Sequence, residues 1–115
     1  MRLNHKEGAA AEDAALQYLK KQGCTLIARN WHCPFGEIDL IVKNGHTIVF
    51  VEVKYRKSSH FGGAAHSITP SKLDKLQRSA ELYLQQNRLN RAPCRLDAVL
   101  IQGNQTPEWI KNITG

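Results

Sequence analysis

The chain has 115 residues, of which 42% are hydrophobic, and this is enough for one compact domain over residues 1–115 and too little for two. Its formal charge of +6 favours a polyanionic partner such as nucleic acid over the role of binding a single acidic substrate or a neutral ligand. No run approaches the roughly 20 apolar residues that span a bilayer. The opening MRLNHKEG lacks the apolar stretch of a secretory signal, so we expect a cytoplasmic protein.

Two helices and four strands, with a short fifth strand, are predicted in the order α-β-β-β-α-β. We expect a helix over residues 9–22, a strand over 24–32, a β-hairpin over 36–56, a helix over 70–86, a strand over 94–102 and a short strand within 108–113. Gly23 follows the first helix as its C-terminal cap, and Thr69 and Pro70 occupy the N-cap and first position of the second. The pattern predicts a mixed β-sheet with helices packed on it.

The hairpin register follows from its turn. Asn44-Gly45 is typical of a two-residue type I′ turn, in which both central residues have positive φ. The opposed pairs are then Lys43 and His46, Leu40 and Val49, Asp39 and Phe50, and Glu37 and Glu52. A three-residue turn would reverse the parity and place Asp39 in the apolar core, which is energetically unfavourable.

Strand alternation places all the charges of the hairpin on one face. The apolar face is expected to carry Ile38, Leu40, Val42, Val49, Val51 and Val53. The other face is expected to carry Ile41, Ile48 and Phe50 near the turn, and Glu37, Asp39, Glu52 and Lys54 at the far end. Because cross-strand neighbours lie about 5 to 8 Å apart, Asp39 and Glu52 could converge on one ion. The alternative is a solvated ion pair of Glu52 and Lys54, which would leave Asp39 unexplained.

Glu12 is a further carboxylate in an unexpected position. On a helical projection it lies among the apolar residues of the first helix, Gly8, Ala15, Leu16 and Leu19. The simpler interpretation is that Glu12 lies at the rim of this stripe and pairs with a basic residue. Beside the hairpin charges, an inward carboxylate also fits a metal site.

These residue types suit metal-assisted hydrolysis of a phosphodiester. Carboxylate oxygens bind Mg²⁺ while leaving positions for water and phosphate. Lys54 shares a strand face with Glu52, where it could orient or deprotonate a water or offset charge on phosphorus. Zinc is disfavoured because the chain has no CxxC or HxxxH pair, and the three widely spaced cysteines are typical of buried, reduced thiols.

The sequence resembles the YraN-like family of small bacterial proteins over nearly its whole length. The resemblance rests on Glu12 and on the segments RNWHCPFGEIDLI, VFVEVKYR, FGGAAHSITPSKLDKL and RLDAVL. That family is similar to PD-(D/E)xK nucleases, especially archaeal Holliday-junction resolvases, which implies a restriction-endonuclease-like α/β fold with an α-β-β-β-α-β core. The motif acids then fall on Asp39 and Glu52, the motif lysine on Lys54 and the helix glutamate on Glu12. Ile38 departs from the motif, which has proline there.

Basic and aromatic residues supply candidates for DNA contact. Arg56, Lys57, His60 and His66 border a glycine-bearing loop that could close over a phosphate backbone, although an ordinary solvated loop fits equally. Lys72, Lys75 and Arg78 recur at helical spacing and form either a basic stripe or a solvated face. Trp31, Tyr55 and Trp109 could stack on bases, although core packing is the commoner role. Asp97 is expected to pair with a neighbouring arginine.

The sequence thus predicts an endonuclease that depends on Mg²⁺ or Mn²⁺ and acts on DNA, with branched or otherwise structured DNA as the candidate substrate. Glu12, Asp39 and Glu52 would hold the metal, Lys54 would position the nucleophilic water, and Arg56, Lys57, His60, Lys72 and Lys75 would contact DNA. Whether two chains act as a homodimer is left open. The alternatives are a nucleic-acid-binding or assembly protein that keeps the fold without turnover, and a protein-binding adaptor.

Overall fold

The computed structural model describes residues 5–57 and 68–114. Its elements are α1 (His5–Lys21), β1 (Thr25–Cys33), β2 (Gly36–Asn44), β3 (Thr47–Arg56), α2 (Pro70–Gln86), β4 (Cys94–Gln102) and β5 (Glu108–Ile110). The α-β-β-β-α-β order predicted from the sequence is confirmed. The first helix begins at His5, earlier than the predicted residue 9.

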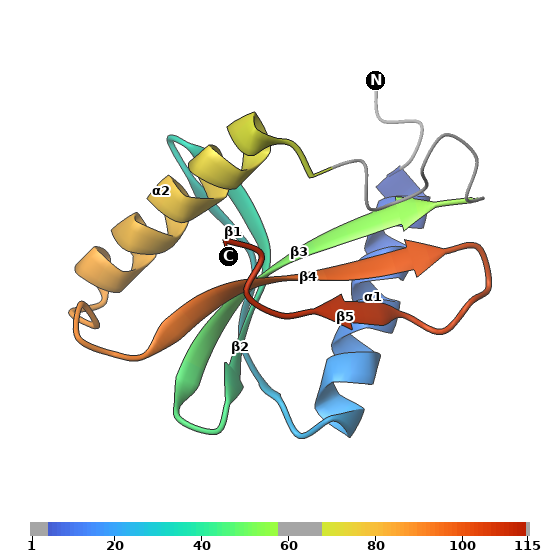
Figure 1. Cartoon of the computed structure of the whole chain (residues 1–115), viewed down its shortest axis with the longest axis horizontal. Coiled ribbons are helices and arrows are strands. Elements are labelled where there is room, and N and C mark those ends of the chain that lie inside the picture. The colour runs from blue at the N-terminus through green and yellow to red at the C-terminus, as the bar shows by residue number, and fades with distance from the viewer. Residues whose placement is uncertain (1–4, 58–67, 115) are drawn as a thin grey trace.

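One five-stranded mixed sheet forms the centre of the fold, with the strands in sequence order β1-β2-β3-β4-β5. β3 and β4 are parallel and are connected through α2, while the other neighbours are antiparallel. The helices cover opposite faces, as Figure 1 shows. The α1 side buries Leu16 and Leu19 against Val49 and Val51, and the α2 side buries Leu76 against Phe50.

Both helices have the expected caps. Gly23 has φ 97°, and the N–H groups of Gly23 and Cys24 donate to the carbonyls of Lys20 and Leu19, which closes the C-terminus of α1. At the start of α2, the Thr69 hydroxyl accepts a 3.2 Å hydrogen bond from the Lys72 N–H. These caps fix where each helix begins or ends relative to the sheet.

The hairpin turn differs from the prediction by one residue. Asn44 pairs with Thr47, so the central residues are Gly45 and His46, and of these two only Gly45 has a positive φ, 64°. That pattern matches a type II′ turn, which needs glycine only at the first central position. The register therefore has Leu40 opposite Val51, and the predicted pairing of Glu37 with Glu52 is wrong.

Besides a bulge between Leu26 and Ala28 in β1, strand alternation breaks at a pair of facing residues. Arg29 pairs with Leu40 and Trp31 pairs with Ile38, so Asn30 faces Asp39. Leu40 packs on the α1 side, whereas Ile38 packs on the α2 side with Trp31. The placement of Ile38 on the Leu40 face was therefore wrong. At this point Asn30 has φ 53°, and the strand leaves its regular pleat.

Asp97 is a fully buried carboxylate with a structural role. It accepts hydrogen bonds from Arg95 Nε, Trp109 Nε1 and the Asn112 N–H, at 2.8 to 3.1 Å. The predicted pairing with an arginine is confirmed. Because these donors come from β4, β5 and the segment after β5, the carboxylate fastens the C-terminal segment to the sheet.

The three cysteines are free thiols. Cys24 is buried as predicted, Cys33 is partly exposed, and Cys94 is exposed, contrary to the expectation of burial. Within residues 5–57 and 68–114, no helix has both the length and the apolar character needed to cross a membrane.

Candidate functional site

A gap between β2 and β3 forms the centre of the candidate site. The pairing of these strands ends at Leu40 opposite Val51. Further along β3, the Val53 N–H donates a 2.8 Å hydrogen bond to Asp39 Oδ2. The Asp39 carboxylate therefore takes the place of a backbone acceptor and lies between the two strands.

Three carboxylates from two distant parts of the chain meet at this gap. Oxygens of Glu12, Glu37 and Asp39 all lie within 4.8 Å of one another. Glu12 comes from α1, and its side chain is only 16% exposed, which confirms the inward orientation predicted from the helical projection. Glu37 and Asp39 come from β2. The spacing is short enough for one cation to contact all three.

Glu12 also has a basic partner, as the simpler interpretation expected. Arg29 Nε lies 3.4 Å from Glu12 Oε1, but the stronger contact of the same guanidinium is with Asp13 Oδ1, at 2.6 Å. The pKa of Arg29 is raised chiefly by the Asp13 hydrogen bond, with Glu12 contributing less. Glu12 is therefore only weakly engaged by this cation.

Glu52 and Lys54 form a close ion pair on the α2 side of β3. Lys54 Nζ lies 2.9 Å from Glu52 Oε2, and the two side chains are only 17% and 18% exposed, so a solvated surface pair is excluded. Burial by itself lowers the pKa of Lys54, but the charge and hydrogen bond of Glu52 outweigh burial and the pKa is raised. Lys54 is thus a charged donor near neutral pH, which favours orienting a water over deprotonating it.

The pKa of Asp39 is raised to about 8. Burial is the largest cause, followed by the charge of Glu52, and the Val53 hydrogen bond only partly offsets them. Glu12 adds a smaller repulsion. Because Glu52 and Glu12 repel the ionised form of Asp39, a divalent cation bound beside these carboxylates would favour that ionised form. The donors are all carboxylate oxygens, which suits Mg²⁺ or Mn²⁺ and disfavours metals that prefer sulfur or nitrogen ligands.

Glu37 belongs to the carboxylate cluster with Glu12 and Asp39, where the sequence predicted Glu52. Among the described residues, the close carboxylate group contains Glu37, while Glu52 lies near enough to Asp39 to raise its pKa but pairs with Lys54. Glu37 stood on the Asp39 face in the prediction, but was treated as a repulsive neighbour of Glu52. Its observed contacts are His32 Nε2 at 3.2 Å and Asn30 Nδ2 at 3.1 Å, both from β1.

Asn30 was not among the site residues predicted from the sequence. Its Nδ2 group donates to Glu12 Oε1 at 3.0 Å as well as to Glu37. The available signal was an asparagine in the middle of a predicted strand, since asparagine is depleted in strands and tolerates positive φ better than most residues.

The predicted DNA-contacting residues are only partly brought together. Lys72 lies in the first turn of α2, and its pKa is lowered by its side-chain contact with Lys54 and by the positive charge there. Arg56 and Lys57 are exposed at the end of β3, and Lys75 is exposed on α2. Arg78 is engaged by Asp74 at 3.0 Å. His60 and His66 lie outside the described residues.

The aromatic candidates are partly buried and pack on the core. Trp31 makes an edge contact with Tyr83, with ring centroids 5.3 Å apart. Tyr55 and Trp109 pack against the α1-side core. The structure therefore favours the core role for these rings.

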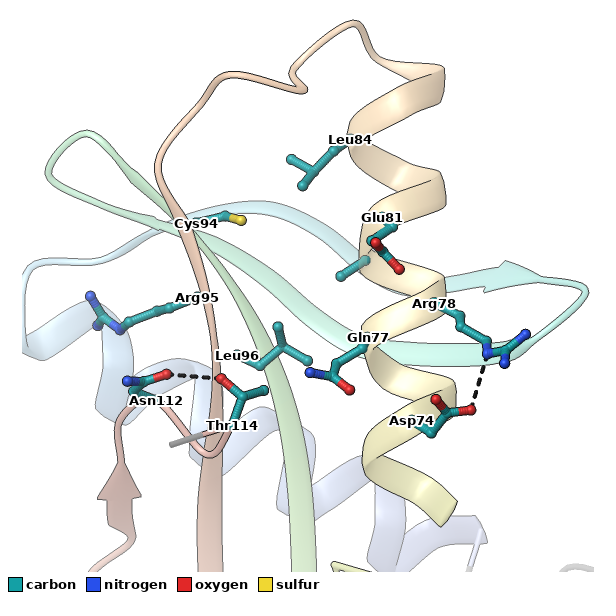
Figure 2. A pocket seen from close by; sticks show the side chains of 11 residues that line it. Asp74, Gln77, Arg78, Glu81, Leu84, Cys94, Arg95, Leu96, Asn112 and Thr114 are labelled. Atoms are coloured by element: carbon teal, nitrogen blue, oxygen red, sulfur yellow. Dashed lines mark hydrogen bonds and ion pairs between the residues drawn. The ribbon is translucent and has the colours of Figure 1, made fainter. Parts of the chain in front are cut away.

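A hollow lies between α2 and β4, apart from Glu12, Glu37 and Asp39. Its volume is about 660 Å³, and its walls include Gln77, Glu81, Leu84 and Leu96, as Figure 2 shows. None of the residues that meet at the gap lines it. The hollow therefore takes no part in the candidate site.

Comparison with known proteins places the chain in one family. Residues 11–101 match the family described as "Uncharacterised protein family UPF0102". The chain belongs to this family. It is 76% identical over 115 residues to a UPF0102 protein of Neisseria gonorrhoeae, with all of both chains covered. It is 51% and 47% identical over 106 residues to UPF0102 proteins of Nitrosomonas eutropha and Shewanella loihica, with 92% of this chain and 90% and 91% of the relatives covered.

The span that matches the UPF0102 family contains the whole candidate site. Glu12 lies next to its first residue, and the hairpin with Asp39, Glu52 and Lys54 lies within it. β5 lies beyond its end. The sequence resemblance to YraN-like proteins is thus confirmed at the level of the family.

Proposed function

We propose that this protein is a Mg²⁺-dependent endonuclease that hydrolyses phosphodiester bonds in DNA, with branched or structured DNA as its substrate. One observation carries the proposal: the gap between β2 and β3 brings oxygens of Glu12, Glu37 and Asp39 within 4.8 Å of one another, beside the ammonium of Lys54. Carboxylates and an adjacent ammonium are the groups that metal-assisted phosphodiester hydrolysis requires.

Glu12, Glu37 and Asp39 would hold the cation, with Glu52 on the neighbouring strand acting directly or through water. When bound, the cation would supply Lewis acidity toward a phosphate oxygen and lower the pKa of a bound water. The raised pKa of Asp39 means that cation and proton compete for this carboxylate.

Lys54 would offset charge on the phosphate. Glu52 fixes its ammonium at 2.9 Å and keeps it charged, so its remaining N–H groups can donate to a water or a phosphate oxygen. Lys72 adds a second ammonium from α2. These two lysines give the α2 side of the gap a positive character that complements an anionic substrate.

The net charge of +6 supports a polyanionic partner. Arg56, Lys57 and Lys72 would contact phosphates near the gap, and Lys75 would extend this surface along α2. Since each chain carries one such site, we further propose that two chains act as a homodimer when both strands of a DNA structure are cut.

The test is single-turnover cleavage of linear duplex, single-stranded, flap and four-way-junction DNA with Mg²⁺ or Mn²⁺. Lys54→Met keeps much of the side chain but removes the ammonium, so we expect cleavage to slow by roughly 10² to 10⁴ with little change in metal affinity. Lys54→Arg should restore the charge beside Glu52 without restoring the rate, because a guanidinium is wider and planar.

Lys43→Met is the matched control, since Lys43 is exposed near the hairpin turn and away from the gap. It should cleave at the parent rate. Full activity in a folded Lys54→Met protein would end the assignment. DNA binding without metal-dependent cleavage of any substrate would instead favour the binding or assembly role.

A further inference from the structure

Asn30 has an unusual backbone conformation at the gap. It faces Asp39 across the β1–β2 ladder and has φ 53° in the middle of a strand. Left-handed backbone is costly for residues with a side chain, and asparagine is among the few that adopt it readily. Such a conformation persists only where its surroundings hold it, and it often marks a functional position.

The Asn30 side chain connects two of the three clustered carboxylates. Its Nδ2 group carries two hydrogens, and it donates at 3.0 Å to Glu12 Oε1 and at 3.1 Å to Glu37 Oε2. Glu12 belongs to α1 and Glu37 to β2, so the amide connects a helix to a strand that is distant from it in the chain. Two neighbouring carboxylates repel, and a shared donor offsets part of that repulsion.

Arg29 does not duplicate this connection. Its guanidinium approaches Glu12 at 3.4 Å but is directed mainly to Asp13 at 2.6 Å and to the Ala9 carbonyl at 3.2 Å. His32 contacts Glu37 alone among the three carboxylates. Among the described residues, Asn30 is the one that bonds to both glutamates.

We infer that Asn30 is a positioning residue, which holds the Glu12 and Glu37 carboxylates in the arrangement that binds one divalent cation. This inference rests on the metal site of the proposed function. The left-handed backbone at residue 30 directs the amide toward both glutamates. Residues that orient metal ligands contribute about 10- to 100-fold in metal affinity.

Asn30→Gly is the decisive variant because glycine adopts φ 53° without strain but has no amide. We expect Mn²⁺ affinity, measured by calorimetry or by electron paramagnetic resonance of free Mn²⁺, to fall about 10- to 100-fold. Cleavage, where measured, should recover at saturating metal, since Lys54 and Glu52 are untouched.

Asn112→Gly is the matched control. Asn112 also has a left-handed backbone, φ 57°, but lies after β5 and bonds to Asp97 and Thr114. It should bind Mn²⁺ as the parent does, while its melting temperature shifts by about as much as that of Asn30→Gly.

Parent-like Mn²⁺ affinity in Asn30→Gly would overturn the inference and leave the proposed function intact. If Asn30→Gly fails to fold while Asn112→Gly folds, the amide serves the fold and the inference is also overturned. If the parent itself binds no Mn²⁺ at millimolar concentration, both the inference and the metal site of the proposed function fall.

Discussion

Asp39 is a largely buried carboxylate whose pKa responds to burial and to two neighbouring acids. Glu52 and Glu12 both repel its charge, and its only backbone donor among the described residues is the Val53 N–H. Burial and these neighbours raise its pKa to about 8. A carboxyl group with such a pKa is protonated at neutral pH unless a cation is bound, so its protonation and metal binding are linked.

The stability of the metal-free protein should therefore depend on pH in a defined direction. An unfolded aspartate has a pKa of about 3.9, whereas folded Asp39 titrates at about 8. Between these values the unfolded chain loses the proton that the folded chain keeps, so stability falls as pH rises from about 4 to about 8 and then levels.

Asp39→Asn removes this dependence, because the amide stays neutral and its oxygen can still accept from Val53. A full shift of this size corresponds to about 6 kcal/mol, of which the part between pH 5 and pH 8 is about 4 kcal/mol. Urea unfolding with chelator at pH 5 and pH 8.5 should show the variant gaining this much over the parent at the higher pH. A parent that instead gains stability relative to the variant as pH rises would contradict the assignment.

At the scale of elements, the β2–β3 hairpin decides which carboxylates meet. A type II′ turn at Gly45-His46 shifts the pairing by two residues from the type I′ alternative at Asn44-Gly45. The parity is unchanged, so Asp39 and Glu52 still approach each other, and one further step of the observed register would place them opposite. The strands separate at that step, which leaves room for the Asp39 carboxylate between them.

The turn should be sensitive to glycine replacement. Gly45 has φ 64°, and nothing lies within 4 Å of the place that a methyl group would take, so Gly45→Ala adds strain without a clash and should destabilise by about 1 to 2 kcal/mol. Gly8→Ala is the same substitution at an exposed position within α1, and should stabilise by about 0.5 to 1 kcal/mol. Equilibrium urea unfolding measures both, and an unaffected Gly45→Ala would contradict the type II′ assignment.

At the scale of the whole molecule, the site lies where both helices approach the same end of β3. α1 supplies Glu12 from one side of the sheet, while Lys72 at the start of α2 lies beside Lys54 on the other. The sheet is covered by a helix on each face, and the apolar residues of its central strands pack in these two cores. The strand gap is where charged side chains from both faces come together.

DNA binding should be electrostatic and separable from cleavage. With chelator present, about four phosphate contacts would give a slope near −3.6 in a plot of log affinity against log salt. Lys72→Met should reduce the magnitude of that slope by about 1, and Lys43→Met should leave it unchanged.

Glu52→Gln should abolish DNA cleavage and retain DNA binding. Absent or salt-insensitive binding to linear, single-stranded, flap and junction DNA would rule out the nucleic-acid role.

Local patterns were sufficient for the elements and for part of the site. Helical periodicity placed Glu12 inward, Thr69 and Gly23 marked helix ends, and alternation along β3 put Glu52 and Lys54 on one face, because each of these depends on residues within a few positions.

Only the tertiary structure decided how those pieces meet. Asn44-Gly45 and Gly45-His46 both suit a two-residue turn, and the choice between them depends on how β2 and β3 pack between two helices. The face of Ile38, the recruitment of Glu37 and the role of Asn30 all follow from one break in alternation, which requires β1 and β2 to leave the regular pleat together. Sequence periodicity is a property of one strand, whereas such a break is stabilised by contacts between elements distant in the chain, and so it is settled only when they pack.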